Sequence, residues 1–295
     1  MRFVSIRRGD QIGLAVAKPG GTEFRGLFAG ERDYPGDLAA LIAVGPDGLG
    51  AAGVRLQNAP VIDMTTVQYL PPLPAPGKII CVGLNYADHS AESGFKVPTY
   101  PTIFGRFASS LIGHNAAIVR PLVSEQLDYE GEFVAVIGTG GREISRASAL
   151  SHIAGYSLFN DASIRDYQFK APQWTMGKNF DDTGAFGPWF VTADDLPPGA
   201  KGLRLQTRLN GNIVQDTSTD DLIFDVASLV SILSEAFTLE AGDIIVTGTP
   251  GGVGVARTPP LWMKPGDLCE IEMDGLGVLS NRIVDQVAGA TRRVA

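Results

Sequence analysis

The chain has 295 residues, of which 44% are hydrophobic and 19% are charged, and its formal net charge is −8 at pH 7. This length and composition are those of a protein with a sizeable buried core, arranged as one large domain or as one domain with a smaller partner. The acidic balance, without a basic cluster longer than a pair, argues against a nucleic-acid partner, and no apolar run approaches the roughly 20 residues needed to span a bilayer.

The first residues and the cysteines indicate a cytoplasmic location. The segment MRFVSIRRGDQ turns charged after a short apolar stretch and does not have the pattern of a signal peptide. Cys81 and Cys269 stand in apolar, strand-like contexts without metal or redox spacing. We therefore expect no disulfide framework, no membrane partner and a reducing cytoplasm.

Residues 1–70 are expected to form a small α/β domain. The segments FVSIRR and IGLAVAK predict a β-hairpin across Gly9–Asp10, and the segment from Asp37 to Val44 predicts a short helix. Prolines at positions 71, 72, 74 and 76 predict an extended linker over residues 71–77, because proline cannot continue a helix or a central strand. We place a domain boundary there.

Residues 78–295 are expected to form a larger, mainly β domain. Short apolar runs broken by glycine, such as KIICVG, EFVAVIG and GDIIVTGTPGG, are typical of a sandwich or roll. Apolar residues at helical spacing from Val226 to Phe237 predict one clear helix. The segment from Ser151 to Leu158 predicts either a short helix or a passage from helix to strand. The expected fold class is α+β, mainly β with some α.

Three acidic residues stand at alternate positions in LDYEGEFVAVIGTG, namely Asp128, Glu130 and Glu132. Alternate residues of a strand share a face, so three carboxylates would precede Val134 and Val136 on one face. Charges that lead into apolar neighbours need compensation, and Mg²⁺ and Mn²⁺ prefer oxygen ligands. The alternative is a strand end whose acidic side chains face water, and the spacing alone favours neither.

His89 and Glu92, in CVGLNYADHSAESG, are candidates for proton transfer. If residues 87–93 are helical, the two side chains share a face of that helix. A carboxylate that orients a histidine makes it a general base near neutral pH. The alternative is a surface pair without a catalytic role.

The segment NDASIRDYQ supplies three more candidates. Asp161 closes an apolar stretch, and it is either a further metal ligand or the cap of the next helical turn, where Asp is preferred. Arg165 and Gln168 are three residues apart, so they would share a face of that turn and could contact a carboxylate or a carbonyl group.

Two glycine-rich segments complete the set. In QWTMGKNFDDTGAFGPW, Lys178 could bind a substrate carboxylate or stabilise developing negative charge, or it could be an ordinary exposed lysine. In VTGTPGGVG, Thr249 follows a strand in a turn whose backbone N–H groups can point at an anion. That turn lacks the lysine of a phosphate-binding loop, so a nucleotide-dependent enzyme is not favoured.

Taken together, these segments resemble the fumarylacetoacetate hydrolase family. The shared motifs are, in order, GLNYADHSAE, PTIFGRFASSLIG, LDYEGE, NDASIRDYQ, MGKNFDDTGAFGPW and VTGTPGGVG, within residues 76–285. The resemblance implies a mixed β-sandwich roll as the catalytic domain, a homodimer, and a site for Mg²⁺ or Mn²⁺. It favours the metal site over the solvated strand end.

The resemblance also implies roles for single residues. The metal ligands would be Glu130, Glu132 and Asp161, with Asp128 in a supporting position. The implied catalytic residues are His89, Glu92 and Lys178. The implied substrate-binding residues are Arg106, Arg165, Gln168 and Thr249. Many relatives have lysine at the position of Arg106, and arginine offers a two-pronged carboxylate contact, so substrate length or charge is expected to differ.

The implied activity is metal-dependent hydrolysis of a C–C bond in a small anionic 2,4-dioxo acid of the acylpyruvate or fumarylpyruvate type, in the catabolism of aromatic compounds or sugars. Glu92 would orient His89, which deprotonates a water, and the leaving fragment is a pyruvate-type enolate that the cation stabilises. Decarboxylation of oxaloacetate, and isomerisation or decarboxylation of 2-hydroxyhepta-2,4-diene-1,7-dioate, are alternatives on the same site. A non-catalytic metal-dependent binding protein is less favoured, because the full set of acidic residues is present.

Overall fold

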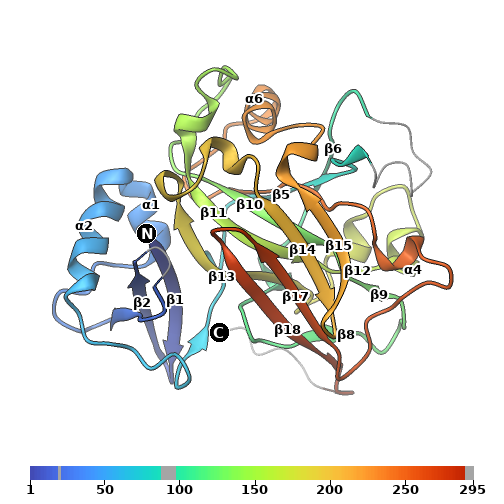
Figure 1. Ribbon diagram of the computed structural model, residues 1–295, viewed down its shortest axis with the longest axis horizontal. Helices are drawn as coiled ribbons and strands as arrows, with labels where there is room; N and C mark the ends of the chain where they lie inside the picture. The colour runs from blue at the N-terminus through green and yellow to red at the C-terminus, as the bar shows by residue number, and fades with distance from the viewer. Residues whose placement is uncertain (19–20, 88–97, 290–295) are drawn as a thin grey trace.

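The computed structural model of the chain describes residues 1–18, 21–87 and 98–289, and Figure 1 shows how their elements are arranged. Two large sheets dominate the fold, with helices at their margins, which confirms the expected mainly β architecture with some α. Within these three segments, no helix combines the length and the apolar character that a membrane crossing requires.

The larger sheet has eleven strands within the described residues. Its main path runs in the order β3 (Arg25–Phe28), β2 (Gln11–Ala17), β1 (Arg2–Arg8), β13 (Gly184–Thr192), β11 (Ile153–Asp161), β10 (Gly131–Ile137), β16 (Ile244–Val246), β5 (Ile79–Gly83) and β6 (Thr102–Gly105). Two short strands lie off this path, β4 (Gln68–Tyr69) beside β1 and β7 (Leu111–Ile112) beside β13.

The second sheet runs in the order β15 (Asn212–Ser218), β14 (Arg204–Leu209), β17 (Leu268–Met273), β18 (Gly277–Asp285) and β8 (Ile118–Arg120). A short ribbon pairs β12 (Ser163–Ile164) with β9 (Leu127–Asp128). The described α-helices are α1 (Leu38–Val44), α2 (Pro46–Gln57), α4 (Arg165–Gln168), α5 (Thr175–Lys178) and α6 (Val226–Ala236). The 3₁₀ turns are η1 (Ala108–Ser110), η2 (Ala149–His152), η3 (Ala193–Asp195), η4 (Pro198–Ala200), η5 (Thr219–Asp221) and η6 (Gly254–Ala256).

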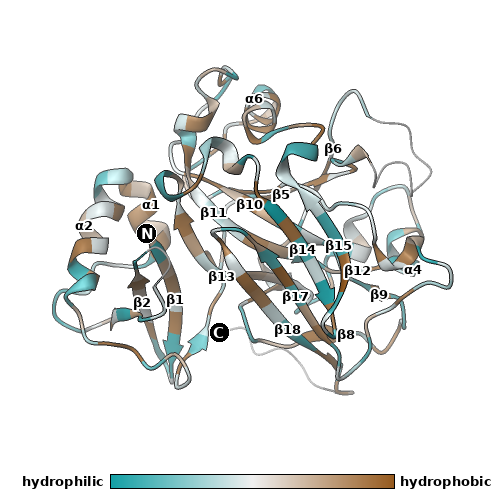
Figure 2. Cartoon of the chain, in the orientation of Figure 1, coloured by the Kyte–Doolittle hydropathy of each residue, from teal (hydrophilic) through white to brown (hydrophobic). Residues whose placement is uncertain are grey.

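A large apolar core lies between the two sheets. Hydrophobic and hydrophilic residues alternate along β14 and β17, so one face of the second sheet packs inward and the other is polar (Figure 2). The predicted helix is confirmed as α6, and its helical spacing brings Leu229, Val230 and Leu233 into this core. The Asp225 side chain caps α6 by accepting a hydrogen bond from the Ser228 N–H.

The N-terminal hairpin and the helix after Asp37 are also confirmed. β1 pairs with β2 along its whole length, and the Asp37 side chain caps α1. β1 also pairs with β13, so the first residues continue the larger sheet. Ile42 of α1 packs in the same apolar cluster as Val134 of β10. Residues 70–78 form neither helix nor strand, and the division into domains at 71–77 stays a prediction.

Strand β10 is central, and both of its faces are buried. Phe133 and Ala135 pack in the core between the sheets, whereas Val134 and Val136 pack in the cluster that the N-terminal helices cover. This explains why its sequence is a continuous apolar run. The strand begins at Gly131, where a Cβ atom would lie 2.0 Å from the Thr207 hydroxyl oxygen, so only glycine allows this approach to the second sheet.

Strand β11 brings the second acidic segment to β10. The turn η2 leads directly into β11, so the segment from Ser151 to Leu158 is the passage into a strand rather than a helix. β11 pairs antiparallel with β10, and Asn160 lies opposite Gly131. The end of β11 therefore meets the beginning of β10.

His114 is expected to make the fold sensitive to mild acid. Its ring packs edge-on against the Tyr69 ring, with the ring centroids 4.7 Å apart, and its Nδ1 accepts a hydrogen bond from the Ser280 N–H. Burial lowers the pKa of His114 to about 4. The unfolded chain binds a proton near pH 6.5 and the folded chain does not, so stability is lost as pH falls from about 6.5 to about 4. By about pH 5 the loss reaches roughly 2 kcal/mol.

Urea unfolding at about pH 7.5 and about pH 5 checks this effect against His114→Gln, which cannot titrate in this range. The wild-type chain is expected to lose roughly 2 kcal/mol more than the variant. Equal losses in the two proteins would contradict the assignment.

Candidate metal centre

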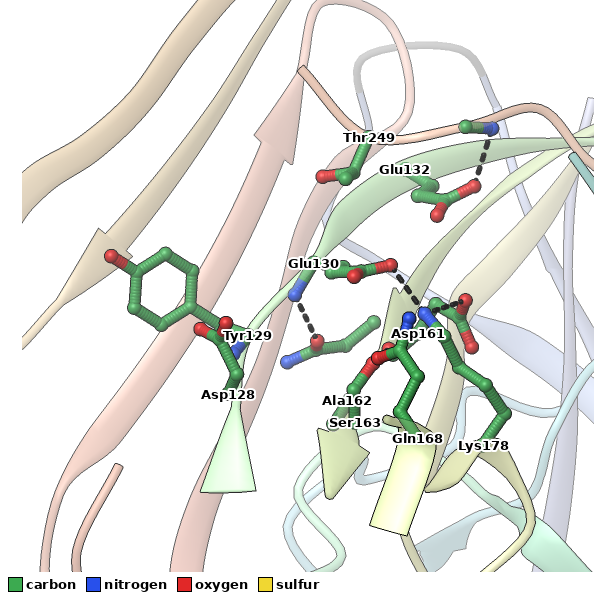
Figure 3. Close-up of polar contacts among 12 residues, drawn as sticks. Asp128, Tyr129, Glu130, Glu132, Asp161, Ala162, Ser163, Gln168, Lys178 and Thr249 are labelled. Atoms are coloured by element: carbon green, nitrogen blue, oxygen red, sulfur yellow. Dashed lines mark hydrogen bonds and ion pairs between the residues drawn. The ribbon is translucent and has the colours of Figure 1, made fainter. Parts of the chain in front are cut away.

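Three buried carboxylates meet where β10 and β11 pair. Glu130 immediately precedes β10, Glu132 lies within it, and Asp161 is the last residue of β11. One oxygen from each lies within 4.8 Å of the others. The predicted ligand set is thus brought together by the antiparallel register, and the Asp161 N–H donates to the Glu130 carbonyl oxygen at 2.9 Å. Figure 3 shows dashed lines from the Lys178 ammonium group to Glu130 and Asp161, with Glu132 on the far side of Glu130 and Asp128 apart from all three.

The Lys178 ammonium group lies between two of these acids. Its Nζ lies 2.6 Å from Glu130 Oε2 and 2.7 Å from Asp161 Oδ2, and the side chain is 2% exposed. Burial disfavours the charged lysine, but the charges of Asp161 and Glu130 outweigh it, so its pKa is raised. Lys178 is therefore a buried ammonium ion between two acids, and the alternative of an exposed lysine is wrong.

Two arginines hold the other side of the same acids. Arg165 Nη2 lies 2.6 Å from Glu130 Oε1, and Arg106 Nη1 donates to Asp161 Oδ1. The buried charged groups of this region are Asp128, Glu130, Glu132, Asp161, Arg106, Arg165 and Lys178. When all of them are ionised, these four acids and three bases leave one negative charge in excess.

The excess charge is centred on Glu132. Within residues 1–18, 21–87 and 98–289, no basic side chain pairs with Glu132, whose Oε2 accepts the Gly248 N–H. Burial, followed by the charges of Asp161 and Glu130, raises the pKa of Glu132 well above its usual range. An all-oxygen donor set with uncompensated charge fits a hard divalent cation such as Mg²⁺ or Mn²⁺.

The glycine-rich turn after β16 donates a backbone hydrogen bond to the Glu132 carboxylate. Gly248 has a positive φ of 108°, and its N–H points at Glu132. The sequence predicts that this turn directs N–H groups at an anion, and in the structure that anion is the side chain of Glu132, a candidate metal ligand. A Cβ atom at Gly248 would lie 2.7 Å from the Cβ atom of Asn85, so the close packing requires glycine.

A cavity of about 380 Å³ opens onto two of the carboxylates, Glu130 and Glu132. Glu130, Glu132, Lys178 and Thr249 contribute to its lining, and so does the α4 residue Gln168. This volume falls near the lower end of the range for small-ligand sites. The cavity therefore suits a small acid.

The predicted substrate-binding residues differ in their environments. Gln168 lines the cavity, and its Oε1 accepts a hydrogen bond from Arg165 on the same turn. Thr249 also lines the cavity, but its hydroxyl donates to the Gly131 carbonyl oxygen and accepts from Gln215. The Thr249 hydroxyl proton is thus already used, and the side chain can only accept a further hydrogen bond.

Arg106 is buried behind Asp161. Its guanidinium donates to Asp161, to the Ala162 carbonyl oxygen, and to the side chains of Ser110 and Thr183, and it is not among the cavity-lining residues. These contacts favour a role in holding Asp161, and the predicted substrate contact gains no support from them. His89 and Glu92 lie outside the described residues, and their roles stay predictions.

Two aromatic residues in the cavity wall were not predicted. Phe104 of β6 and Trp174 pack edge-to-face with ring centroids 5.4 Å apart, and both line the cavity. The Trp174 ring covers Gly83, where a Cβ atom would lie 2.4 Å from it. The sequence did offer a signal for Trp174, because a tryptophan in a polar, glycine-containing segment is expected to pack its large ring against an apolar surface.

The matches to known proteins agree with this architecture. The model of the fumarylacetoacetate hydrolase C-terminal family matches residues 78–284. A mitochondrial oxaloacetate tautomerase from Homo sapiens is 36% identical over 291 residues, which cover 96% of this chain and 92% of that protein.

Solved structures extend the agreement to three dimensions. A fumarylacetoacetate hydrolase from Exiguobacterium antarcticum has a TM-score of 0.84 and 34% identity, over 97% of this chain and all of that one. A maleylpyruvate hydrolase from Sphingobium, in complex with manganese(II) and pyruvate, has a TM-score of 0.79 and 26% identity, with the same coverage. Our chain belongs to the fumarylacetoacetate hydrolase family.

Proposed function

We propose that the protein is a divalent-cation-dependent enzyme that interconverts the keto and enol forms of a small 2-oxo acid, with oxaloacetate as its substrate. The observation that carries the proposal is the buried group of Glu130, Glu132 and Asp161 at a cavity large enough for such an acid. The choice of oxaloacetate is supported by the similarity to the human oxaloacetate tautomerase.

The charge of the site suits an anionic substrate. With all seven buried groups ionised, the site has one negative charge in excess, and a divalent cation would change this to one positive charge. A dicarboxylic 2-oxo acid would then enter a site of opposite charge. Without the cation, the same carboxylates would repel it.

Keto–enol conversion moves a proton between C3 and the oxygen on C2, so negative charge develops on that oxygen when the C3 proton leaves. A divalent cation held by the three carboxylates would supply the Lewis acidity that stabilises this charge. Lys178 and Gln168 line the cavity, and both can donate hydrogen bonds to substrate oxygens. We assign the proton transfer to His89, oriented by Glu92, on the sequence pattern alone.

Hydrolysis of a C–C bond in a 2,4-dioxo acid is the second candidate. It is favoured by the similarity to the maleylpyruvate hydrolase that holds manganese(II) and pyruvate. The same developing charge on a 2-oxo acid fragment would be stabilised, and His89 would take its proton from water instead of from C3.

The two candidates are separated by mixing the purified chain and Mg²⁺ or Mn²⁺ with enol oxaloacetate and, in parallel, with an acylpyruvate. We expect the ultraviolet absorbance of the enol to decay faster with the protein than in buffer alone. A chelator should abolish this acceleration. His89→Gln should lower this rate by about 100-fold or more while manganese still binds, whereas the control His152→Gln should not. Cleavage of acylpyruvate without tautomerisation would favour the second candidate, and neither activity would contradict the proposal.

A further inference from the structure

Asp128 is a buried carboxylate whose acceptor sites are all filled. Its Oδ1 accepts the N–H groups of Tyr129 at 2.8 Å and Gly254 at 2.7 Å. Its Oδ2 accepts the Val255 N–H at 2.9 Å and Arg165 Nε at 2.8 Å. A carboxylate has about four lone-pair sites, so these contacts leave none for a metal ion. Asp128 therefore acts on the site through its partners.

Each of the three side-chain nitrogens of Arg165 contacts a different side chain, two by hydrogen bonds and one by an ion pair. While Nε donates to Asp128, Nη1 donates to Gln168 Oε1 at 2.8 Å, and Nη2 lies 2.6 Å from Glu130 Oε1. The guanidinium group is planar and rigid, so a fixed Nε also fixes the directions of both Nη atoms. The position of Asp128 thus determines how Arg165 meets a metal-ligand candidate and a cavity residue at once.

The orientation of Gln168 follows from this contact. Because its amide oxygen faces Arg165, its NH₂ group is the part of the amide left for the cavity, where it can donate to an oxygen of an anionic substrate. If Arg165 rotated away, the amide could turn and present its oxygen instead. That oxygen would repel a substrate carboxylate.

The same carboxylate also holds one wall of the cavity. Two of the N–H groups that it accepts, those of Gly254 and Val255, belong to η6, and Val255 and Ala256 line the cavity. Gly254 lies so close that a Cβ atom there would be 2.0 Å from the Leu261 carbonyl oxygen and 2.5 Å from Asp128 Oδ1. The contacts of Asp128 therefore help to position the η6 wall directly, and Glu130 and Gln168 through Arg165.

We propose that Asp128 is a positioning residue that fixes Glu130 and Gln168 through Arg165. This inference rests on the proposed function, because it takes Glu130 as a metal ligand. It differs from a purely electrostatic role, in which the negative charge of Asp128 would attract the cation directly, and from a purely structural role in the η6 loop. In both of those cases the effect of Asp128 would not depend on Arg165.

The test is a double-mutant cycle read by calorimetric titration with Mn²⁺. Asp128→Asn replaces one of the two acceptor oxygens with an NH₂ donor, and Arg165→Lys keeps the positive charge but cannot contact all three partners of the guanidinium group. Each single change is expected to weaken manganese binding by about 10–100-fold, the usual effect of losing a partner of a metal ligand. In the Arg165→Lys background, Asp128→Asn should add less than about threefold, because its effect passes through the missing guanidinium.

Arg208→Lys is the matched control, because Arg208 also pairs with two carboxylates, Glu270 and Glu272, but on the outer face of the second sheet. It should bind manganese as the wild type does. Wild-type affinity in Arg165→Lys, or an undiminished effect of Asp128→Asn in that background, would overturn the inference. If Asp128→Asn does not fold, Arg165→Lys decides alone. A wild-type chain that binds no manganese would overturn the proposed function together with the inference.

Discussion

Glu132→Gln is expected to weaken Mg²⁺ and Mn²⁺ binding by at least about 100-fold and to remove turnover, while the metal-free protein keeps at least wild-type stability. Glu132 is the buried carboxylate without a basic partner among the described residues. The amide has the same shape, and its oxygen can still accept the Gly248 N–H, but it carries no charge that needs compensation. Loss of a metal ligand thus comes without loss of the fold.

Calorimetric titration and urea unfolding in the presence of a chelator measure the two effects separately. Asp243→Asn is the control, because Asp243 is also a buried acid but pairs with Lys78 away from the candidate metal centre. It is expected to lower stability and leave metal binding unchanged. Wild-type manganese affinity in Glu132→Gln would contradict the ligand assignment.

Lys178→Met is expected to have the opposite pattern. Without its ammonium group, Glu130 and Asp161 lose their shared cation, and the metal-free protein should lose about 3–5 kcal/mol of unfolding free energy. Saturating Mn²⁺ should restore part of this loss, because a cation that binds only the folded state stabilises it. Turnover should still fall by about 10²–10³-fold, since a donor to the developing oxyanion is lost.

Lys78→Met is the matched control for stability. Lys78 also contacts two acids, Glu240 and Asp243, but its side chain is 32% exposed. Because solvent reaches Lys78 and its partner Glu240 is exposed, the loss of unfolding free energy is expected to be smaller than that of Lys178→Met. Equal losses in the two variants, measured by urea unfolding, would show that burial of Lys178 has no special effect.

The strands that carry the candidate metal ligands were predictable from the sequence, but their proximity in space was not. The apolar run after Glu132 predicted a strand, and Asp161 was placed at a strand end, as observed. Only the register, with Gly131 opposite Asn160, brings these distant segments together. Apolar patterns do not specify which strands pair, so the resemblance to a family had to supply the ligand set.

The sequence pattern predicted that three alternate acids share one strand face, and this was wrong for Asp128. β9 ends at Asp128 and pairs with β12, and β10 begins only at Gly131. The interruption at residues 129–130 turns the Asp128 carboxylate towards Arg165 and η6. Arg106 likewise offered no sequence signal for its burial, because a partner 55 positions away, Asp161, determines it.

Diffraction from crystals grown with Mn²⁺, recorded to give the anomalous signal of manganese, tests the central claim most directly. We expect one manganese peak bridged by carboxylate oxygens of Glu130, Glu132 and Asp161, with Asp128 still bound to Arg165. A manganese-saturated crystal with no anomalous peak between these three side chains would contradict the account.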